Sequence, residues 1–271
     1  MQLIDTHCHI HEATSLLEGD TATRAKWLQA PNPDPDHMII SAAAVGVVKM
    51  ICVGTSVPDS QLAVQFAQDR DAVWVSIGIH PHEAEHYVDN EKALQQFRDL
   101  ANKPKVVAVG ETGLDYHYMH SPKEAQQRLL RFQLDLAVEH NLPLIFHVRE
   151  AFDDFWNIFD EYQGLRGVVH SFSASEKELE QILQRNLYVG LNGIMTFTKK
   201  SEQLEAAKKI PLERILTETD APFLTPVPYR GTICTPKHVK VVAKFVSDLR
   251  GEPLEAFATA TTNNAERLFN I

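Results

Sequence analysis

The chain has 271 residues, and its 36 acidic residues outnumber its 26 basic residues, which gives a formal net charge of −10 at pH 7. So acidic a chain does not attract nucleic acid through its overall charge, and any contact with nucleic acid has to be local. Its three cysteines are too few and too scattered for a disulfide framework or a thiolate zinc site. The thirteen histidines are the unusual feature, because histidine is the commonest metal ligand and the usual proton carrier near neutral pH.

The N-terminus and the apolar runs predict neither a targeting segment nor a membrane span. Residues 1–5 lack the basic stretch and the apolar run of a signal peptide. The longest weakly polar run, residues 38–48, is well short of the ~20 residues that cross a bilayer. We therefore expect a cytoplasmic protein without a membrane partner, as a monomer or weak oligomer.

Short apolar runs alternate with amphipathic stretches along the whole chain. The runs are nearly continuous, which is typical of strands that are buried on both faces of a parallel sheet. The predicted strands cover residues 3–9, 49–54, 73–80, 106–111, 144–148, 167–171, 187–191 and 215–219. Strand–helix units of this number and length predict an α/β fold, a single-domain (β/α)₈ TIM barrel over residues 1–271. A doubly wound open sheet is the alternative, but its phosphate-binding glycine fingerprint is missing after the first strand.

Several segments carry signals for the ends of helices. Residues 121–124, Ser-Pro-Lys-Glu, predict a serine N-cap with a capping box for a helix that runs from Pro122 to His140. Residues 175–178, Ser-Glu-Lys-Glu, predict a second capping box. The proline-rich residues 30–36 predict a surface loop between the first strand and the first helix.

Histidines and carboxylates close five of the predicted strands. In a barrel of this class the active site forms at the carboxyl ends of the strands. Any one of these residues alone is explained by a hydrogen-bonded core histidine or a helix-capping acid. Together they are hard to explain in that way, because such a group in a buried strand costs several kcal/mol unless it is paired or metal-bound. The set suits two divalent ions, Mg²⁺, Mn²⁺ or Zn²⁺. Its members are His7, His9, Glu111, His147, His170 and Asp220.

The motifs around these residues resemble those of the TatD family of metal-dependent hydrolases, within the amidohydrolase-like barrels. They span nearly the whole chain in the family's order. The motifs are residues 5–9 (Asp-Thr-His-Cys-His), 78–82, 110–116, 147–151, 170–173, 218–222, 226–231 and 262–265. The resemblance implies that His7, His9 and Asp220 bind one ion. It also implies that His147 and His170 bind the second ion, with Glu111 bridging the two.

Three stretches depart from the family pattern. Residues 15–38 are longer than we expect, and Ser171 stands where a cysteine is usual. Residues 232–236 lack the Asn-Glu-Pro that commonly follows the glycine. We expect metal binding to survive these changes, so they bear on the fit of the substrate around Arg230 and Thr235.

The resemblance implies hydrolysis of phosphodiester bonds in DNA. Divalent ions lower the pKa of a water molecule to near neutral and stabilise the attacking and leaving oxygens. Asp220 and Glu111 are the predicted catalytic residues, with Asp220 as the candidate general base. A ligand without a proton role is the alternative for Asp220.

Five further residues are candidates for substrate binding. The two arginines suit phosphate oxygens, and the three histidines could donate to the phosphate or the leaving group. Surface or capping roles are the alternative for the histidines. The candidates are Arg149, Arg230, His80, His82 and His117.

The expected partner is DNA, bound through its backbone without sequence specificity. No helix-turn-helix, zinc finger or basic stripe is visible, so the expected contact is at the scissile phosphate of a frayed or single-stranded end. Tyr116, Tyr118 and Phe223 are aromatics on which bases could stack. The alternative function is a small-molecule amidohydrolase, lactonase or phosphotriesterase-like hydrolase with the same metal centre. A non-catalytic metal-binding scaffold is a third hypothesis, and no feature of the sequence favours it.

Overall fold

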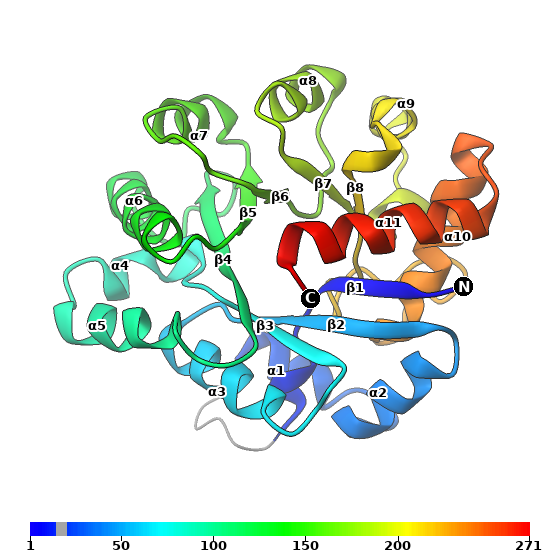
Figure 1. Ribbon diagram of the computed structural model, residues 1–271, viewed down its shortest axis with the longest axis horizontal. Coiled ribbons are helices and arrows are strands. Elements are labelled where there is room, and N and C mark those ends of the chain that lie inside the picture. Colours follow the sequence, from blue (N-terminus) through cyan, green and yellow to red (C-terminus); the bar gives the residue numbers. More distant parts are fainter. Residues whose placement is uncertain (15–20) are drawn as a thin grey trace. The chain divides into compact units, whose positions relative to one another are not determined.

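The computed structural model describes residues 1–14 and 21–271, which form two compact units (Figure 1). The first unit comprises residues 1–52 and 171–271, and the second comprises residues 53–170. The assignment of residues 1–271 to a single domain stays a prediction. Residues 15–20, the start of the unusually long stretch 15–38, lie outside the described residues.

The second unit alternates four strands with helices. Within this unit β3 pairs in parallel with β4, β4 with β5, and β5 with β6. Helix α6 packs against β4 and α7 packs against β5 (Figure 1). The strands are β3 (Val73–Ile77), β4 (Val106–Asp115), β5 (Leu144–Arg149) and β6 (Gly167–Val169). The helices are α3 (Val57–Ala67), η2 (Pro81–Glu83), α4 (Ala84–Tyr87), α5 (Glu91–Leu100), α6 (Lys123–Glu139) and α7 (Phe152–Phe159).

The first unit contains the other strands and both ends of the chain. Strand β1 pairs in parallel with β2 and contacts β8, which pairs in parallel with β7. Helix α11 packs against both β1 and β8. The strands are β1 (Leu3–Cys8), β2 (Val47–Val53, which ends at the unit boundary), β7 (Tyr188–Leu191) and β8 (Ile215–Thr217). The helices are η1 (Ile10–Ala13), α1 (Ala22–Trp27), α2 (Pro35–Ala43), α8 (Glu176–Gln184), η3 (Gly193–Thr196), α9 (Ser201–Lys209), η4 (Leu212–Arg214), η5 (Pro236–His238), α10 (Val239–Arg250) and α11 (Leu254–Phe269).

All eight predicted strands are present, and their apolar runs are buried as expected. The second capping box is also confirmed, because Ser175 begins α8 and its N–H donates to Glu178 Oε2 at 3.0 Å. The three cysteines are buried free thiols.

The predicted cap at Ser121 is wrong. Helix α6 begins at Lys123 after Pro122 and has no side-chain cap. The Ser121 hydroxyl instead donates to the His82 carbonyl at 2.7 Å and accepts from the Glu85 N–H at 3.1 Å. A tertiary contact to η2 and α4 therefore replaces the local contact that the motif favours.

The prediction for the proline-rich loop is also wrong in its position. A short helix, α1, precedes residues 30–36, so the loop does not join the first strand to the first helix. Helix α2 then begins at Pro35, with Asp34 as its N-cap. Proline is favoured at the first position of a helix because its missing N–H would have no partner there.

Strand β4 extends further than the sequence predicts. The apolar run predicts an end at Glu111, but the strand continues to Asp115. Gly113 lies in this extension with φ of +151°, and a Cβ there would lie 1.9 Å from the His147 carbonyl oxygen. Only glycine permits so close an approach to β5, which pairs Gly113 with His147. Glu111 therefore lies within β4, not at its end.

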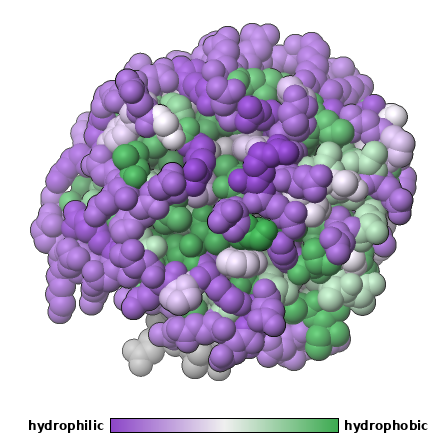
Figure 2. Space-filling view, in the orientation of Figure 1, coloured by the Kyte–Doolittle hydropathy of each residue, from purple (hydrophilic) through white to green (hydrophobic). Residues whose placement is uncertain are grey.

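The face of the molecule drawn in Figure 2 is predominantly polar. Figure 2 shows hydrophilic side chains over most of the visible face, with hydrophobic ones between them. Among the helices that the structure describes, none has the length and apolar character that a bilayer crossing requires.

Candidate metal centre

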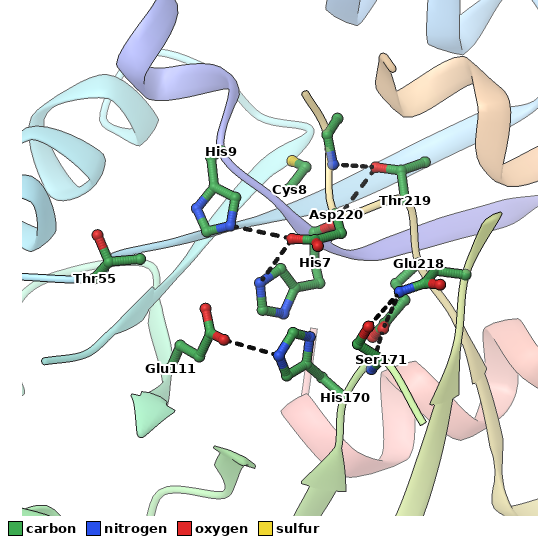
Figure 3. A network of polar contacts seen from close by, with 12 residues as sticks. His7, Cys8, His9, Thr55, Glu111, His170, Ser171, Glu218, Thr219 and Asp220 are labelled. Atoms are coloured by element: carbon green, nitrogen blue, oxygen red, sulfur yellow. Dashed lines mark hydrogen bonds and ion pairs between the residues drawn. The ribbon is translucent and has the colours of Figure 1, made fainter. Parts of the chain in front are cut away.

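The first unit brings together two predicted histidine ligands and one predicted carboxylate ligand (Figure 3). His7 lies in β1, and His9 directly follows it. Both imidazoles face the same oxygen, because Asp220 Oδ1 lies 3.7 Å from His7 Nε2 and 3.4 Å from His9 Nε2. Asp220 has a left-handed φ of +59°, and its N–H donates to the His7 carbonyl at 2.8 Å. The backbone thus fixes Asp220 beside β1.

Asp5 holds the two strands of this group together. It is fully buried, and its carboxylate accepts from the N–H and the hydroxyl of Thr219 at 2.9 and 2.6 Å. Burial raises the pKa of Asp5 well above its usual range, against the lowering effect of Thr219. Asp5 therefore fixes the chain next to Asp220 through hydrogen bonds.

The second unit places three imidazole nitrogens around one oxygen, Glu111 Oε1. His147 Nδ1 and His170 Nε2 each lie 2.8 Å from this oxygen, and His80 Nε2 lies 3.4 Å from it. Figure 3 shows the contact with His170. His147 lies in β5, and His170 directly follows β6. His80, predicted as a substrate residue, is thus placed among the predicted ligands.

The charges within this group depend on one another. Burial would raise the pKa of Glu111, but the nearby imidazoles of His170 and His80 and the hydrogen bond from His147 lower it well below its usual range. Burial lowers the pKa of His80 to about 4, despite the opposing effect of Glu111. At neutral pH the group therefore presents an ionised carboxylate and a neutral His80, which are the forms that bind a cation.

Asp115 is a site residue that the sequence reasoning did not assign. It is fully buried at the end of β4, and its Oδ2 lies 3.0 Å from His147 Nε2 and 3.1 Å from His82 Nε2. Its Oδ1 accepts from the N–H groups of His117 and Tyr118 at 3.0 and 2.9 Å. Burial raises its pKa, but the hydrogen bonds from His147 and His82 bring it well below the usual range. The sequence feature that could have identified Asp115 is its position in the motif at residues 110–116, four residues after Glu111.

Glu218 is a second buried acid without an assigned role. Its Oε1 accepts from the Ser171 N–H at 2.6 Å, and a Cβ on Gly190 would lie 2.3 Å from its Oε2. The Ser171 hydroxyl, where the family pattern has a cysteine thiol, accepts from Asn192 Nδ2 at 2.9 Å. The serine is thus used in a polar contact beside the predicted centre.

The remaining substrate candidates lie in different surroundings. His82 contacts Asp115, whereas the exposed His117 pairs with Glu150 at 2.8 Å between Nδ1 and Oε1. The Arg149 guanidinium lies 4.6 Å from the centre of the Tyr118 ring. Arg230 lies 3.9 Å from the centre of the Phe197 ring, and its Nη1 donates to the Thr225 carbonyl at 2.9 Å. Their roles toward a substrate stay predictions.

The donor atoms fit a divalent cation. His80, Glu111 and His147 each offer a ligand atom within 4.8 Å of the others, with their side chains largely withdrawn from solvent. Converging imidazole nitrogens and carboxylate oxygens suit Zn²⁺ and Mn²⁺, and a carboxylate with water also suits Mg²⁺. The identity of the ion and the number of ions stay open.

The fold class is confirmed by comparison with solved structures. YjjV, a TatD homologue of Escherichia coli K12, is 29% identical, covers 99% of this chain and 98% of its own, and has a TM-score of 0.83. The chain has the predicted (β/α)₈ TIM-barrel fold. A TatD family hydrolase from Entamoeba histolytica, 23% identical with a TM-score of 0.85 and 99% and 98% of the two chains covered, shares the fold.

Curated relatives agree with the chemistry of the donors. YabD of Bacillus subtilis, described as an uncharacterized metal-dependent hydrolase, is 36% identical over 99% of both chains. TatD of Cronobacter sakazakii, described as a 3′-5′ ssDNA/RNA exonuclease, is 35% identical over 87% of this chain and 92% of its own. The fold, the donor set and these relatives define a metal-dependent hydrolase.

The family model described as TatD related DNase matches residues 4–270. The chain therefore belongs to the TatD family, as its motifs predicted.

Proposed function

We propose that this chain is a deoxyribonuclease that hydrolyses phosphodiester bonds with two divalent ions. The observation that carries the proposal is the buried Glu111 carboxylate, on which three imidazole nitrogens converge within 3.4 Å. The relative described as a 3′-5′ ssDNA/RNA exonuclease supports nucleic acid as the substrate class.

The predicted ligands divide into two groups in this proposal. His7, His9 and Asp220 would hold one ion, and His147 and His170 would hold the other. The bridging role of Glu111 belongs to the same proposal and rests on the family resemblance. Bound ions would lower the pKa of a water molecule and offset charge on the phosphate.

The residues of the chain have separate tasks in the reaction. Asp220 has a partly exposed side chain (17%) and accepts the proton of the attacking water. Arg149 and Arg230 hold phosphate oxygens through their guanidinium groups. His80, neutral because burial lowers its pKa to about 4, is a proton acceptor or a further ligand near Glu111 and carries no competing positive charge.

The test is hydrolysis of end-labelled DNA oligonucleotides, single-stranded and duplex, with Mg²⁺, Mn²⁺ or Zn²⁺ or with EDTA. We expect release of nucleotides that requires the ion and is lost in EDTA. A fully metallated protein that cleaves no form of DNA contradicts the proposal. Turnover of a lactone, amide or phosphotriester by such a protein would establish the small-molecule alternative.

The number of ions is tested separately by the metal content per chain. We expect two ions for the native protein and one for His147→Ala, because that variant keeps His7, His9 and Asp220. Equal metal content in the two proteins contradicts the assignment of His147.

A further inference from the structure

An exposed aromatic side chain lies among polar rings in the loop after β4. Tyr118 is 52% exposed. The ring centre of Tyr118 lies 4.8 Å from that of His117, 5.6 Å from that of His82 and 5.7 Å from that of His120. Even with these neighbours, half of the tyrosine remains open to solvent. Of the three aromatics predicted to stack on bases, Tyr116 is instead engaged by Asp154, Gln127 and Lys123, and Phe223 is half-buried.

The position of Tyr118 is fixed relative to the predicted metal ligands. Its backbone N–H donates to Asp115 Oδ1 at 2.9 Å, and Oδ2 of the same carboxylate lies 3.0 Å from His147 Nε2. One buried carboxylate therefore connects the backbone of Tyr118 to a predicted ligand. A group bound on the Tyr118 ring is held close to the Glu111 group.

Arg149 supplies a positive charge beside the same ring. Its guanidinium lies 4.6 Å from the Tyr118 ring centre, and in the described part of the chain it forms no ion pair with a carboxylate. Arg128 and Arg131 of the same unit, by contrast, pair with Asp89 and Glu161. Arg149 lies at the end of β5, two residues after His147. Its charge is therefore available to an anion near the metal centre.

We propose that Tyr118 and Arg149 form a nucleotide subsite for the end of a single-stranded nucleic acid. A base stacks on the exposed tyrosine ring while the guanidinium holds a neighbouring phosphate. A terminal base in a duplex is held by hydrogen bonds to its partner strand, whereas an unpaired base is free to turn onto the ring, so the subsite selects unpaired ends. The inference rests on the proposed function and adds the residues that bind the unpaired end.

The test compares a normal single-stranded oligonucleotide with one whose terminal nucleotides are abasic. In the native protein kcat/KM is higher for the base-bearing strand, and Tyr118→Ala reduces this preference about 10-fold, toward unity. Tyr118→Phe keeps the stacking surface and the preference. Tyr162→Ala is the control, because Tyr162 contacts Arg131 and Asp135 instead of the subsite. DNA and RNA versions of both strands show which sugar the subsite accepts.

Direct binding gives a readout that does not depend on turnover. A strand with 2-aminopurine at its end, added in EDTA, should lose fluorescence on binding to the native protein and to Tyr118→Phe, but not on binding to Tyr118→Ala. An unchanged preference and equal quenching in Tyr118→Ala overturn the subsite while leaving the nuclease function intact. Absence of cleavage of every strand by the native protein is the separate failure of the proposed function.

Discussion

Asp220 combines a contact to two imidazoles with an unusual backbone conformation. Its Oδ1 faces His7 and His9, while its φ of +59° lies in the left-handed region. Asparagine tolerates this region better than most residues. Asn is therefore a substitution that removes the charge of Asp220 without straining the chain.

We expect Asp220→Asn to lose hydrolysis while the fold persists. An amide neither accepts a proton at neutral pH nor neutralises a cation, so kcat/KM on an oligonucleotide should fall at least about 100-fold. The melting temperature should stay within a few degrees of the native value. Asp153→Asn, in the exposed first turn of α7, is the matched control. Full activity in Asp220→Asn would show that the residue has neither of the proposed roles.

Asp115 gives a prediction about metal affinity. An acid that accepts from a ligating histidine fixes its ring and tautomer, and loss of such a partner typically weakens metal binding 10–100-fold. We expect Asp115→Asn to weaken binding of one ion by about this factor, because the carboxylate charge beside His147 Nε2 is removed. Equilibrium dialysis with Mn²⁺ or Zn²⁺ measures the change.

Asp154→Asn is the control for this experiment, because Asp154 accepts from the Tyr116 hydroxyl and touches no predicted ligand. Unchanged affinity in Asp115→Asn, or an equal loss in both variants, would refute the positioning role. Asp115 also shows that contacts between individual side chains are not predictable from the sequence. The order of residues predicts that acids and histidines lie at strand ends, but it does not show which acid faces which imidazole nitrogen.

At the scale of elements, the long apolar strands were the predictable part. Burial on both faces leaves a continuous hydrophobic run, so β5 was located to within one residue of its end. Segments that depend on distant partners were missed. The Ser121 hydroxyl forms hydrogen bonds with the backbone of His82 and Glu85. Strand β4 continues past Glu111 because Gly113 allows a close approach to β5. Neither contact is visible in the local pattern.

The short helix η5 shows a local motif that the sequence did not reveal. It begins at Pro236, the last residue of the 232–236 stretch that departs from the family pattern. The Thr235 N–H donates to His238 Nδ1 at 2.9 Å, and burial lowers the pKa of His238 to about 4, with Lys237 contributing. His238 thus completes a capping box at the start of η5. Protonation of His238 Nδ1 would leave the Thr235 N–H without this acceptor.

We expect His238 to make stability depend on pH. Its pKa in the folded state lies below the value of about 6.5 in the unfolded chain, so the unfolded state binds the proton first as the pH falls. The contribution of His238 to the free energy of unfolding is present above about pH 6.5. It is lost between pH 6.5 and 4 and is on the order of 2–3 kcal/mol. Urea unfolding at pH 7 and pH 4.5 measures the loss.

The comparison protein is His238→Asn. In this variant the decrease in the free energy of unfolding between pH 7 and pH 4.5 should be smaller by about 2–3 kcal/mol. His37→Asn, which removes an exposed histidine at the start of α2, should leave it unchanged. An equal loss in the native protein and His238→Asn would exclude His238 as its source.

At the scale of the whole molecule, the acidic charge restricts how a nucleic acid is held. The net charge is −10, and the Lys208–Lys209 pair of α9 is occupied by Glu205 and Glu176. The pair therefore forms part of a solvated helix face and not a track for nucleic acid. The proposed phosphate contacts are therefore few, and they centre on Arg149 and Arg230.

The salt dependence of binding measures the number of those contacts. Each phosphate neutralised on a single strand contributes a slope of about −0.7 to the plot of log affinity against log salt, so two arginines predict a slope near −1.4. Affinity for a labelled single strand should then fall only about 7-fold between 50 and 200 mM salt at constant free metal. Arg149→Met should reduce the magnitude of the slope by about 0.7. A basic track that contacts six phosphates would lose several hundred-fold over the same range, and such a result would contradict local recognition by an acidic protein.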